Sequence, residues 1–233
     1  IKEILIGDLQ VSYVAVGEDF RFGFERKGTP AMLKEFGKKY GNFFSILSAI
    51  SNGKNTLPEM EAAMGGISLG GQLKRLEEDY DLIKKKRPIL SKENSQTVRY
   101  DVSDLFLRFW FRYFIKYQNY IEIQNYERLA DIIKKDYPTF SGLALEMYFR
   151  QKMAESKEFR NIGSWWQTKK EKIPCEIDFV GIYADDKHAL VAEVKRQRKN
   201  FKPTEFREKV ETIRTKILSK YEIDSRCLSM DDM

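Results

Sequence analysis

Three charged residues on two successive predicted strands have the types and spacing that metal-assisted hydrolysis requires. Residues 176–183 and 188–195 have the composition of strands, and a four-residue hairpin loop joins them. Pairing the strands across that loop places Asp178 opposite Glu193, and opposed side chains share one face of a sheet about 5 Å apart. Lys195 lies two residues beyond Glu193 and emerges on the same face. We therefore expect two carboxylates and a lysine to converge there.

Carboxylates this close repel each other, and a hard cation between them relieves the repulsion. Mg²⁺, or Mn²⁺ in its place, polarises a phosphodiester and lowers the pKa of bound water. A nearby lysine positions that water or offsets the charge that develops on the phosphate. The arrangement thus predicts Mg²⁺-dependent hydrolysis of a phosphodiester. The alternative is a solvated strand face on which Lys195 and Glu193 form an ordinary ion pair.

Composition excludes several other classes of protein. The chain has 233 residues with 42% hydrophobic and 13% aromatic side chains, a composition that excludes a largely disordered protein. Cys175 and Cys227 lie far apart in a chain that needs no disulfide, which favours reduced thiols and a cytoplasmic location. The one histidine, His188, has no partners at metal-ligand spacing, which excludes a zinc site or a histidine-based triad. The most apolar segment, 105–115, is shorter than a membrane span and contains two arginines, so no membrane partner is expected.

The charge balance permits an anionic partner. The chain carries 41 Lys and Arg against 35 Asp and Glu, which gives a net charge of +6. An excess of this size suits a protein that binds nucleic acid, but many basic proteins bind none. The positions of the basic residues therefore carry more information than their number.

The C-terminal part has the pattern of an α/β domain of ordinary size. A helix is expected over 142–155 and another from Pro203 onwards, with apolar residues at helical spacing. Between and after them the predicted strands are 162–168, 176–183, 188–195 and a short one at 227–230. Residues 103–140 are expected to be helical and to form a spacer ahead of this domain.

The region before the spacer predicts a winged helix-turn-helix. A helix over 43–50 is expected to end at Asn52-Gly53, and the capping box Thr56-x-x-Glu59 begins a second helix that stops at Gly65-Gly66. A third helix runs from Ser68 to Asp79. Two apolar pairs, Leu82-Ile83 and Ile89-Leu90, and the strand 98–102 then form a hairpin.

Basic side chains fall where a winged helix contacts DNA, namely the third helix in the major groove and the wing on the backbone. The candidates are Gln72, Lys74 and Arg75 on the helix, Lys84, Lys85, Lys86 and Arg87 on the hairpin, and Arg196, Arg198 and Lys199 after Lys195. These side chains can neutralise phosphates of duplex or branched DNA. Alternatively, the hairpin is a solvated edge in a packing module, and the last cluster is an exposed turn.

Asp178 followed by Glu193-x-Lys195, with a helical Glu146 upstream, resembles the signature of PD-(D/E)xK nucleases. The resemblance implies a restriction-endonuclease-like α/β domain in which Glu146, Asp178 and Glu193 bind the metal and Lys195 assists hydrolysis. A wider part of the chain resembles the C-terminal region of archaeal-type, DEXX-box P-loop ATPases. The segments that carry it are 35–56, 98–117, 136–149, Trp165-Trp166, 176–180, 193–197 and 228–233.

This resemblance implies four regions: 1–35 as the tail of an upstream ATPase region, 36–102 as the winged helix, 103–140 as the spacer and 141–233 as the nuclease-like domain. No G-x-x-x-x-G-K-[ST] phosphate loop occurs in the chain. ATP is therefore expected to act only through the upstream domain, and this chain alone is not expected to hydrolyse it. Two rivals to a DNA endonuclease remain open, a non-catalytic module that binds DNA or protein and regulates the ATPase, and a protein-interaction scaffold.

Overall fold

The computed structural model describes residues 42–92, 95, 97–167 and 175–233. Contacts divide the chain into two compact units. The first holds the described residues up to Lys84 together with Asp101–Arg112, and the second holds Lys85–Tyr100 and Tyr113–Met233. Each unit has its own core, and each is described by itself. The predicted N-terminal tail, 1–35, lies outside the described residues.

The described part of the first unit begins with three helices. Residues 42–51 form a helix that ends before Gly53, whose φ of +93° suits a residue without a Cβ. The capping box opens α2 (Leu57–Ala63), where Thr56 donates its backbone N–H and its hydroxyl to Glu59 at 3.2 and 2.7 Å. The third helix is α3 (Gly70–Glu78), slightly shorter than the predicted 68–79. The predicted helices of this region are therefore confirmed, and fully buried side chains of all three form its core.

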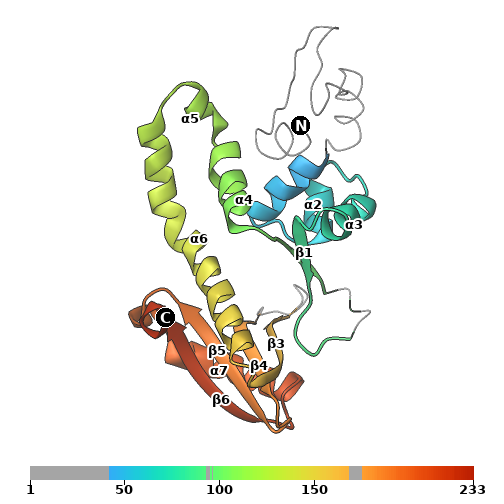
Figure 1. Cartoon of the computed structure of the whole chain (residues 1–233), viewed down its shortest axis with the longest axis vertical. Helices are drawn as coiled ribbons and strands as arrows, with labels where there is room; N and C mark the ends of the chain where they lie inside the picture. Colours follow the sequence, from blue (N-terminus) through green and yellow to red (C-terminus); the bar gives the residue numbers. More distant parts are fainter. Residues whose placement is uncertain (1–41, 93–94, 96, 168–174) are drawn as a thin grey trace. The chain divides into compact units, whose positions relative to one another are not determined.

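The strands β1 (Ile83–Lys86) and β2 (Arg99–Val102) form a two-stranded sheet (Figure 1). Three helices followed by a paired hairpin is the element order that the sequence predicts. The expected strand character of Ile89-Leu90 is wrong, because Ile89 leaves the hairpin and packs into the core of the second unit. Its backbone N–H donates to the Ser164 carbonyl at 2.9 Å. This anchor places residues 85–100 with the second unit.

The helical stretch after the hairpin consists of α4 (Leu105–Phe109), the π-helical segment η3 (Trp110–Ile115), α5 (Gln118–Glu122) and α6 (Tyr126–Glu155). Asp104 caps α4 by accepting from the Leu107 N–H at 2.7 Å. The prediction of a helix that starts at Gly142 is wrong. One 30-residue helix crosses the predicted boundary at residue 140 and contains Pro138 in its interior. A proline inside a helix removes one hydrogen bond but need not end the helix when packing holds both halves.

The second unit is built on a four-stranded sheet in the order β3-β4-β5-β6 (Figure 1). The strands are β3 (Phe159–Trp166), β4 (Glu176–Tyr183), β5 (His188–Lys195) and β6 (Glu222–Ser229). The first three are antiparallel, and β6 runs parallel to β5 after the crossover helix α7 (Pro203–Lys216). The bounds of β4 and β5 are those predicted. The last strand starts five residues earlier than predicted, because its first half alternates charged side chains that read as a loop.

Two apolar clusters cover the two faces of this sheet. On one face Phe206, Val210 and Ile213 of α7 pack with sheet residues that include Ala189 and Val191. On the other face α6 packs against the sheet, and the members of that cluster are Leu145, Phe149, Phe179, Leu190, Ala192, Val194 and Leu228. Side chains of β5 therefore alternate between the α7 face and the α6 face.

Both cysteines are buried free thiols. Trp165 and Trp166 are also buried, which agrees with a packing role for that pair. Among the described residues, no helix has both the length and the apolar composition that a membrane span requires.

Candidate active site

The pairing of β4 with β5 follows the predicted register. Phe179 pairs with Ala192 and Ile182 with Ala189, so the next position in the ladder sets Asp178 against Glu193. There the backbone pairing stops. The Oδ2 atom of Asp178 accepts a hydrogen bond from the Val194 N–H at 2.9 Å. A side-chain carboxylate thus replaces a backbone carbonyl where the ladder ends, and this fixes Asp178 beside the last residues of β5.

Glu193 is a buried carboxylate held by two ammonium groups. Only 8% of the residue is exposed. The Lys195 Nζ lies 2.7 Å from its Oε1, and the Lys209 Nζ lies 3.1 and 3.0 Å from its two oxygens. Burial alone would raise the pKa of Glu193, but the hydrogen bonds from Lys195 and Lys209 outweigh it and lower that pKa. Glu193 is therefore ionised at neutral pH.

The contact with Glu193 also shifts the pKa of Lys195. Its burial opposes the charged form, yet the hydrogen bond that it donates to the Glu193 carboxylate, together with the negative charges of Glu193 and Asp178, raises the pKa of the lysine. The ammonium stays protonated at any physiological pH. It can therefore donate hydrogen bonds or balance negative charge, but it cannot act as a general base while this ion pair is intact.

Lys209 contacts Glu193 but was not among the site residues predicted from the sequence. It lies on α7 between Phe206 and Val210, two residues of the buried apolar stripe of that helix. Its position beside this stripe could have indicated an anionic partner, because a half-buried ammonium near a core needs one. Alternation along β5 turns Glu193 towards α7, which explains why Lys209 reaches it.

Glu146 belongs to the other face of the sheet, since it lies on α6. Its Oε2 pairs with Arg150 at 2.9 Å. Burial and then the negative charge of Asp178 raise its pKa to about 7, while Arg150 and Lys86 act in the opposite direction. Lys86, predicted as a DNA contact of the wing, is thus electrostatically coupled to a candidate active-site carboxylate.

Asp178 connects the two halves of the site. Burial raises its pKa, the hydrogen bond from Val194 lowers it, and the charge of Glu193 raises it again. Asp178 in turn raises the pKa of Glu146. Glu146 lies on α6, which covers one face of the sheet, whereas the Glu193 side chain points from β5 towards Lys209 of α7 on the other face, so the predicted convergence of all three is incomplete. Among the described residues, no group of three or more His, Cys, Asp or Glu side chains is arranged to hold a metal ion.

The types of donor nevertheless fit a hard cation such as Mg²⁺ or Mn²⁺. Carboxylate oxygens are the ligands that these ions prefer. The pKa values of Glu146 and Asp178 are raised partly by neighbouring carboxylate charge, and a cation beside them would relieve that repulsion. Glu146, Asp178 and Glu193 are the residues that would hold it. For Glu193 this requires the exchange of an ammonium contact.

A pocket of about 540 Å³ opens between α6 and the end of β5, and both Glu146 and Lys195 line it. The remaining lining residues are Pro138, Thr139, Gly142 and Leu143 on α6, Val194 on β5, and Arg196, Gln197 and Asn200 beyond the strand. The candidate chemistry therefore has access to a concave surface large enough for a small ligand.

The predicted DNA contacts of α3 are partly engaged within their own unit. Lys74 lies 3.7 Å from Glu78, and both are well exposed. Arg75 lies 3.4 Å from Asp79, donates to the Tyr80 hydroxyl at 3.3 Å and covers the Phe43 ring at 5.6 Å. Gln72 is half-buried. These contacts give Arg75 a packing role in the first unit.

The other basic candidates are more accessible. On and after β1, Lys84, Lys85 and Arg87 are exposed, and Lys86 is half-buried. After β5, Arg196 lies 5.9 Å from the centre of the Tyr137 ring, and Lys199 is exposed. Arg198 is held by the Asp232 carboxylate at 2.6 and 2.7 Å.

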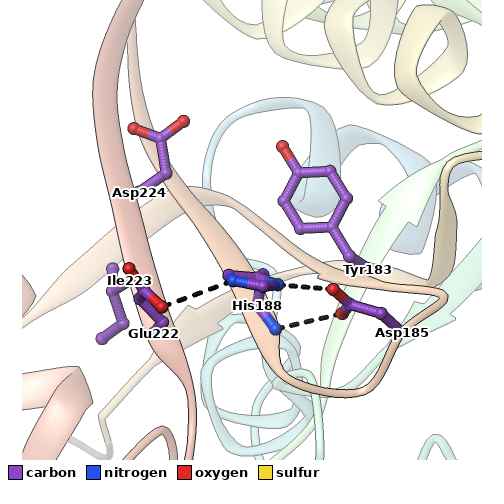
Figure 2. Close-up of a pocket in the computed structure, with 6 residues that line it drawn as sticks. All are labelled: Tyr183, Asp185, His188, Glu222, Ile223 and Asp224. Carbon is purple, nitrogen blue, oxygen red and sulfur yellow. Dashed lines mark hydrogen bonds and ion pairs between the residues drawn. The ribbon is translucent and has the colours of Figure 1, made fainter.

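A second pocket, of about 440 Å³, lies at the opposite end of β5 from Lys195 (Figure 2). His188 stands between Asp185 and Glu222, pairing with the first through Nδ1 and lying 3.4 Å from the second through Nε2. Hydrogen bonds from the backbones and the imidazole lower the pKa of Asp185 to about 2, and the Asp185 contact raises the pKa of His188. The group closes the hairpin, because Asp185 also accepts the Lys187 and His188 N–H groups.

The fold and the site together define an α/β sheet domain with a carboxylate–lysine pair at a strand end. Residues 110–210 match the model of DUF234, a family described as archaeal and bacterial proteins of unknown function. The matched span contains Glu146, Asp178, Glu193, Lys195 and Lys209. An uncharacterized protein of Methanocaldococcus jannaschii is 33% identical over 161 residues, covering 64% of this chain and 34% of that protein. The chain thus spans about a third of this relative's length.

Residues 1–59 match a different family model, described as FAD synthetase. Bifunctional riboflavin kinase/FMN adenylyltransferases from two subspecies of Buchnera aphidicola are 48% identical over 40 residues, 17% of this chain and 13% of those proteins. The interpretation of 1–35 as the tail of an ATPase region lies outside the described residues and stays a prediction. No solved structure matches the chain.

Proposed function

We propose that the second unit is a metal-dependent phosphodiesterase acting on DNA, within a longer ATPase of the archaeal, DEXX-box type. The observation that carries the proposal is the contact of 2.7 Å between Lys195 and Glu193, directly beside Asp178 at the end of the β4–β5 ladder. A lysine and two carboxylates of this kind are what hydrolysis of a phosphodiester requires. The archaeal relative extends well beyond the aligned region, which covers 34% of it, and this is consistent with a larger whole.

Each residue has a separate part in this proposal. Asp178 and Glu193, with Glu146, hold a Mg²⁺ or Mn²⁺ ion, which when bound polarises the phosphodiester and acidifies a water molecule. Lys195 donates hydrogen bonds to the attacked phosphate and offsets the charge that develops on its oxygens. Lys209 keeps the Glu193 carboxylate ionised and oriented.

The test is cleavage of plasmid and branched oligonucleotide DNA with Mg²⁺ or Mn²⁺ and without either. We expect cleavage by the wild type and a loss of at least about a hundredfold in Asp178→Ala and Lys195→Ala, the scale seen for removal of a charge-stabilising group. Lys202→Ala is the matched control, because Lys202 pairs with Glu205 on the surface and lies outside the site. Equal cleavage by all four proteins would defeat the proposal.

A non-catalytic binding module is the second candidate, and one observation favours it. Lys195 and Lys209 together contact both oxygens of Glu193, so this carboxylate is already compensated without a metal ion. On this alternative the domain binds DNA or a protein and regulates an ATPase elsewhere in the longer chain. Calorimetry with Mn²⁺ separates the candidates, because heat of binding that disappears in Asp178→Ala supports the hydrolase. Retained DNA binding with no metal-binding heat and no cleavage supports the module.

A further inference from the structure

The pocket beside the candidate site has two unlike walls. One wall is a face of α6 on which Pro138, Gly142 and Glu146 follow each other at four-residue intervals, one above the next. The other wall is the end of β5 and the turn after it, which contribute Lys195 and Arg196. The α6 wall is therefore apolar at Pro138, Gly142 and Leu143 and ends at the Glu146 carboxylate, whereas the other wall is cationic.

Gly142 gives the α6 wall its depth. A Cβ added at this position would meet nothing within 4 Å, so the space in front of the helix is open at this level. A pocket of about 540 Å³ lies within the range of roughly 300–1,000 Å³ that holds small ligands. A nucleobase is small enough for this pocket, and a base can enter a pocket only when it is outside the stack of a duplex.

The cationic wall carries the features that recognise an unpaired nucleotide. Arg196 lines the pocket on this wall, and its guanidinium lies 5.9 Å from the ring centre of Tyr137, an α6 residue next to the pocket lining that is 45% exposed. Arginine and tyrosine planes are the groups on which exposed bases stack. The amide side chains of Gln197 and Asn200 add hydrogen-bond donors and acceptors to the pocket. The exposed Lys199 follows in the same turn.

We propose that this pocket receives a single unpaired nucleotide of a DNA strand, with its phosphate at Lys195 and Arg196 and its base against the α6 wall. The proposal deepens the function given above and rests on it, since Lys195 is shared with the hydrolytic site. It restricts the substrate to DNA with an unstacked nucleotide, such as a single-stranded end, a flap or a branch point. A nucleotide within an intact duplex would first have to leave its stack, which weakens its binding.

The experiment measures binding without catalysis. Fluorescence anisotropy in EDTA compares a labelled oligo(dT) with a blunt duplex of equal length, for the whole chain. We expect the single strand to bind at least about tenfold more tightly, the ratio that stacking of one base supplies. Gly142→Trp fills the pocket and is expected to remove this preference, while its affinity for the duplex stays unchanged. Lys202→Trp is the matched control, because Lys202 pairs with Glu205 on the surface and lies outside the pocket lining.

A second variant guards against misfolding of the tryptophan protein. Arg196→Ala is expected to weaken binding of the single strand by about tenfold. Lys199→Ala, three residues further and outside the pocket lining, is expected to cost less than about threefold as one exposed phosphate contact.

The outcomes separate this inference from the proposed hydrolase. A preference for the single strand that Gly142→Trp or Arg196→Ala removes supports the pocket assignment, even when Mg²⁺ produces no cleavage. Equal binding of duplex and single strand, or wild-type affinity in both variants, overturns it, even when the protein cleaves duplex DNA. Tighter binding of oligo(U) than of oligo(dT) also overturns it, by placing RNA in the pocket.

Discussion

At Glu193 one buried carboxylate meets two ammonium groups, and only one of them follows from the order of residues along the chain. Lys195 is two positions away on the same strand, so alternation alone predicts that contact. Lys209 is sixteen positions away on α7, and its contact depends on where the crossover helix lies over the sheet. The strand-borne pair was therefore predictable, while the helix-borne partner required the tertiary structure. The same reason explains Glu146, whose position on the α6 face no strand register could give.

Lys209→Met removes one of these partners and tests how much it contributes. We expect a loss of about 1–3 kcal/mol in the free energy of unfolding at pH 7, because a buried carboxylate loses a charged hydrogen bond. Lys209→Arg keeps a charged donor and should therefore retain most of the free energy of unfolding that Lys209→Met loses. Lys202→Met is the control, since its exposed pair with Glu205 is worth about 0.5 kcal/mol or less. Urea unfolding measures all three, and a loss in Lys209→Met no larger than in Lys202→Met contradicts the assignment.

The contribution of Glu193 to the free energy of unfolding depends on pH in a defined direction. The pKa of Glu193 is lowered in the folded protein, so its contribution is present above the ordinary value of 4.5 and disappears as the pH falls through the folded value. The difference between wild type and Lys209→Met should therefore be full at pH 7 and shrink on acidification. A difference that grows towards low pH would show that Lys209 acts by packing rather than by charge.

At the scale of elements, local signals predicted what local interactions decide. The capping box at Thr56, the helix ends at Gly53 and at Gly65-Gly66, and the strands β4 and β5 depend on neighbours within a few residues, and each was predicted at or near its place. The continuous helix α6 and the docking of Ile89 depend on distant partners. The sequence predicted that a helix begins at Gly142, whereas α6 runs through this position, and it predicted a strand at the apolar pair Ile89-Leu90. The segment instead packs against β3.

Substitution of Ile89 tests whether its packing holds residues 85–100 to the second unit. Ile89 is 6% exposed in the core formed with Trp165, and Gly163 approaches it so closely that an added Cβ would lie 3.0 Å from the Ile89 Cβ. We expect Ile89→Ala to destabilise the second unit by about 2–4 kcal/mol, and Gly163→Ala by about 1–3 kcal/mol through overpacking. Leu90→Ala is the control, because the neighbouring side chain is 39% exposed. Thermal unfolding decides, and equal effects at residues 89 and 90 would mean that the segment is not anchored.

At the scale of the whole molecule, the net charge of +6 matters less than the surfaces that carry it. Many basic side chains are already compensated, as Arg75 is by Asp79, Arg198 by Asp232 and Lys195 by Glu193. Exposed basic groups remain on the β1 hairpin and in the turn after β5. The proposed DNA contact of the chain is therefore expected on these two segments rather than on α3, where the sequence also placed basic residues.

The salt dependence of DNA binding tests this distribution of charge. Each phosphate contact contributes about 0.9 to the slope of log affinity against log salt concentration. Replacing the exposed Lys84, Lys85 and Arg87 by Gln should reduce that slope by about 2–3 and weaken binding to every DNA sequence alike. Arg75→Gln serves as the comparison, and we expect it to lower thermal stability while leaving the slope within about 0.5, since Arg75 contacts Asp79 and Phe43. A slope unchanged in the triple variant but reduced in Arg75→Gln would move the DNA contact from the hairpin to α3.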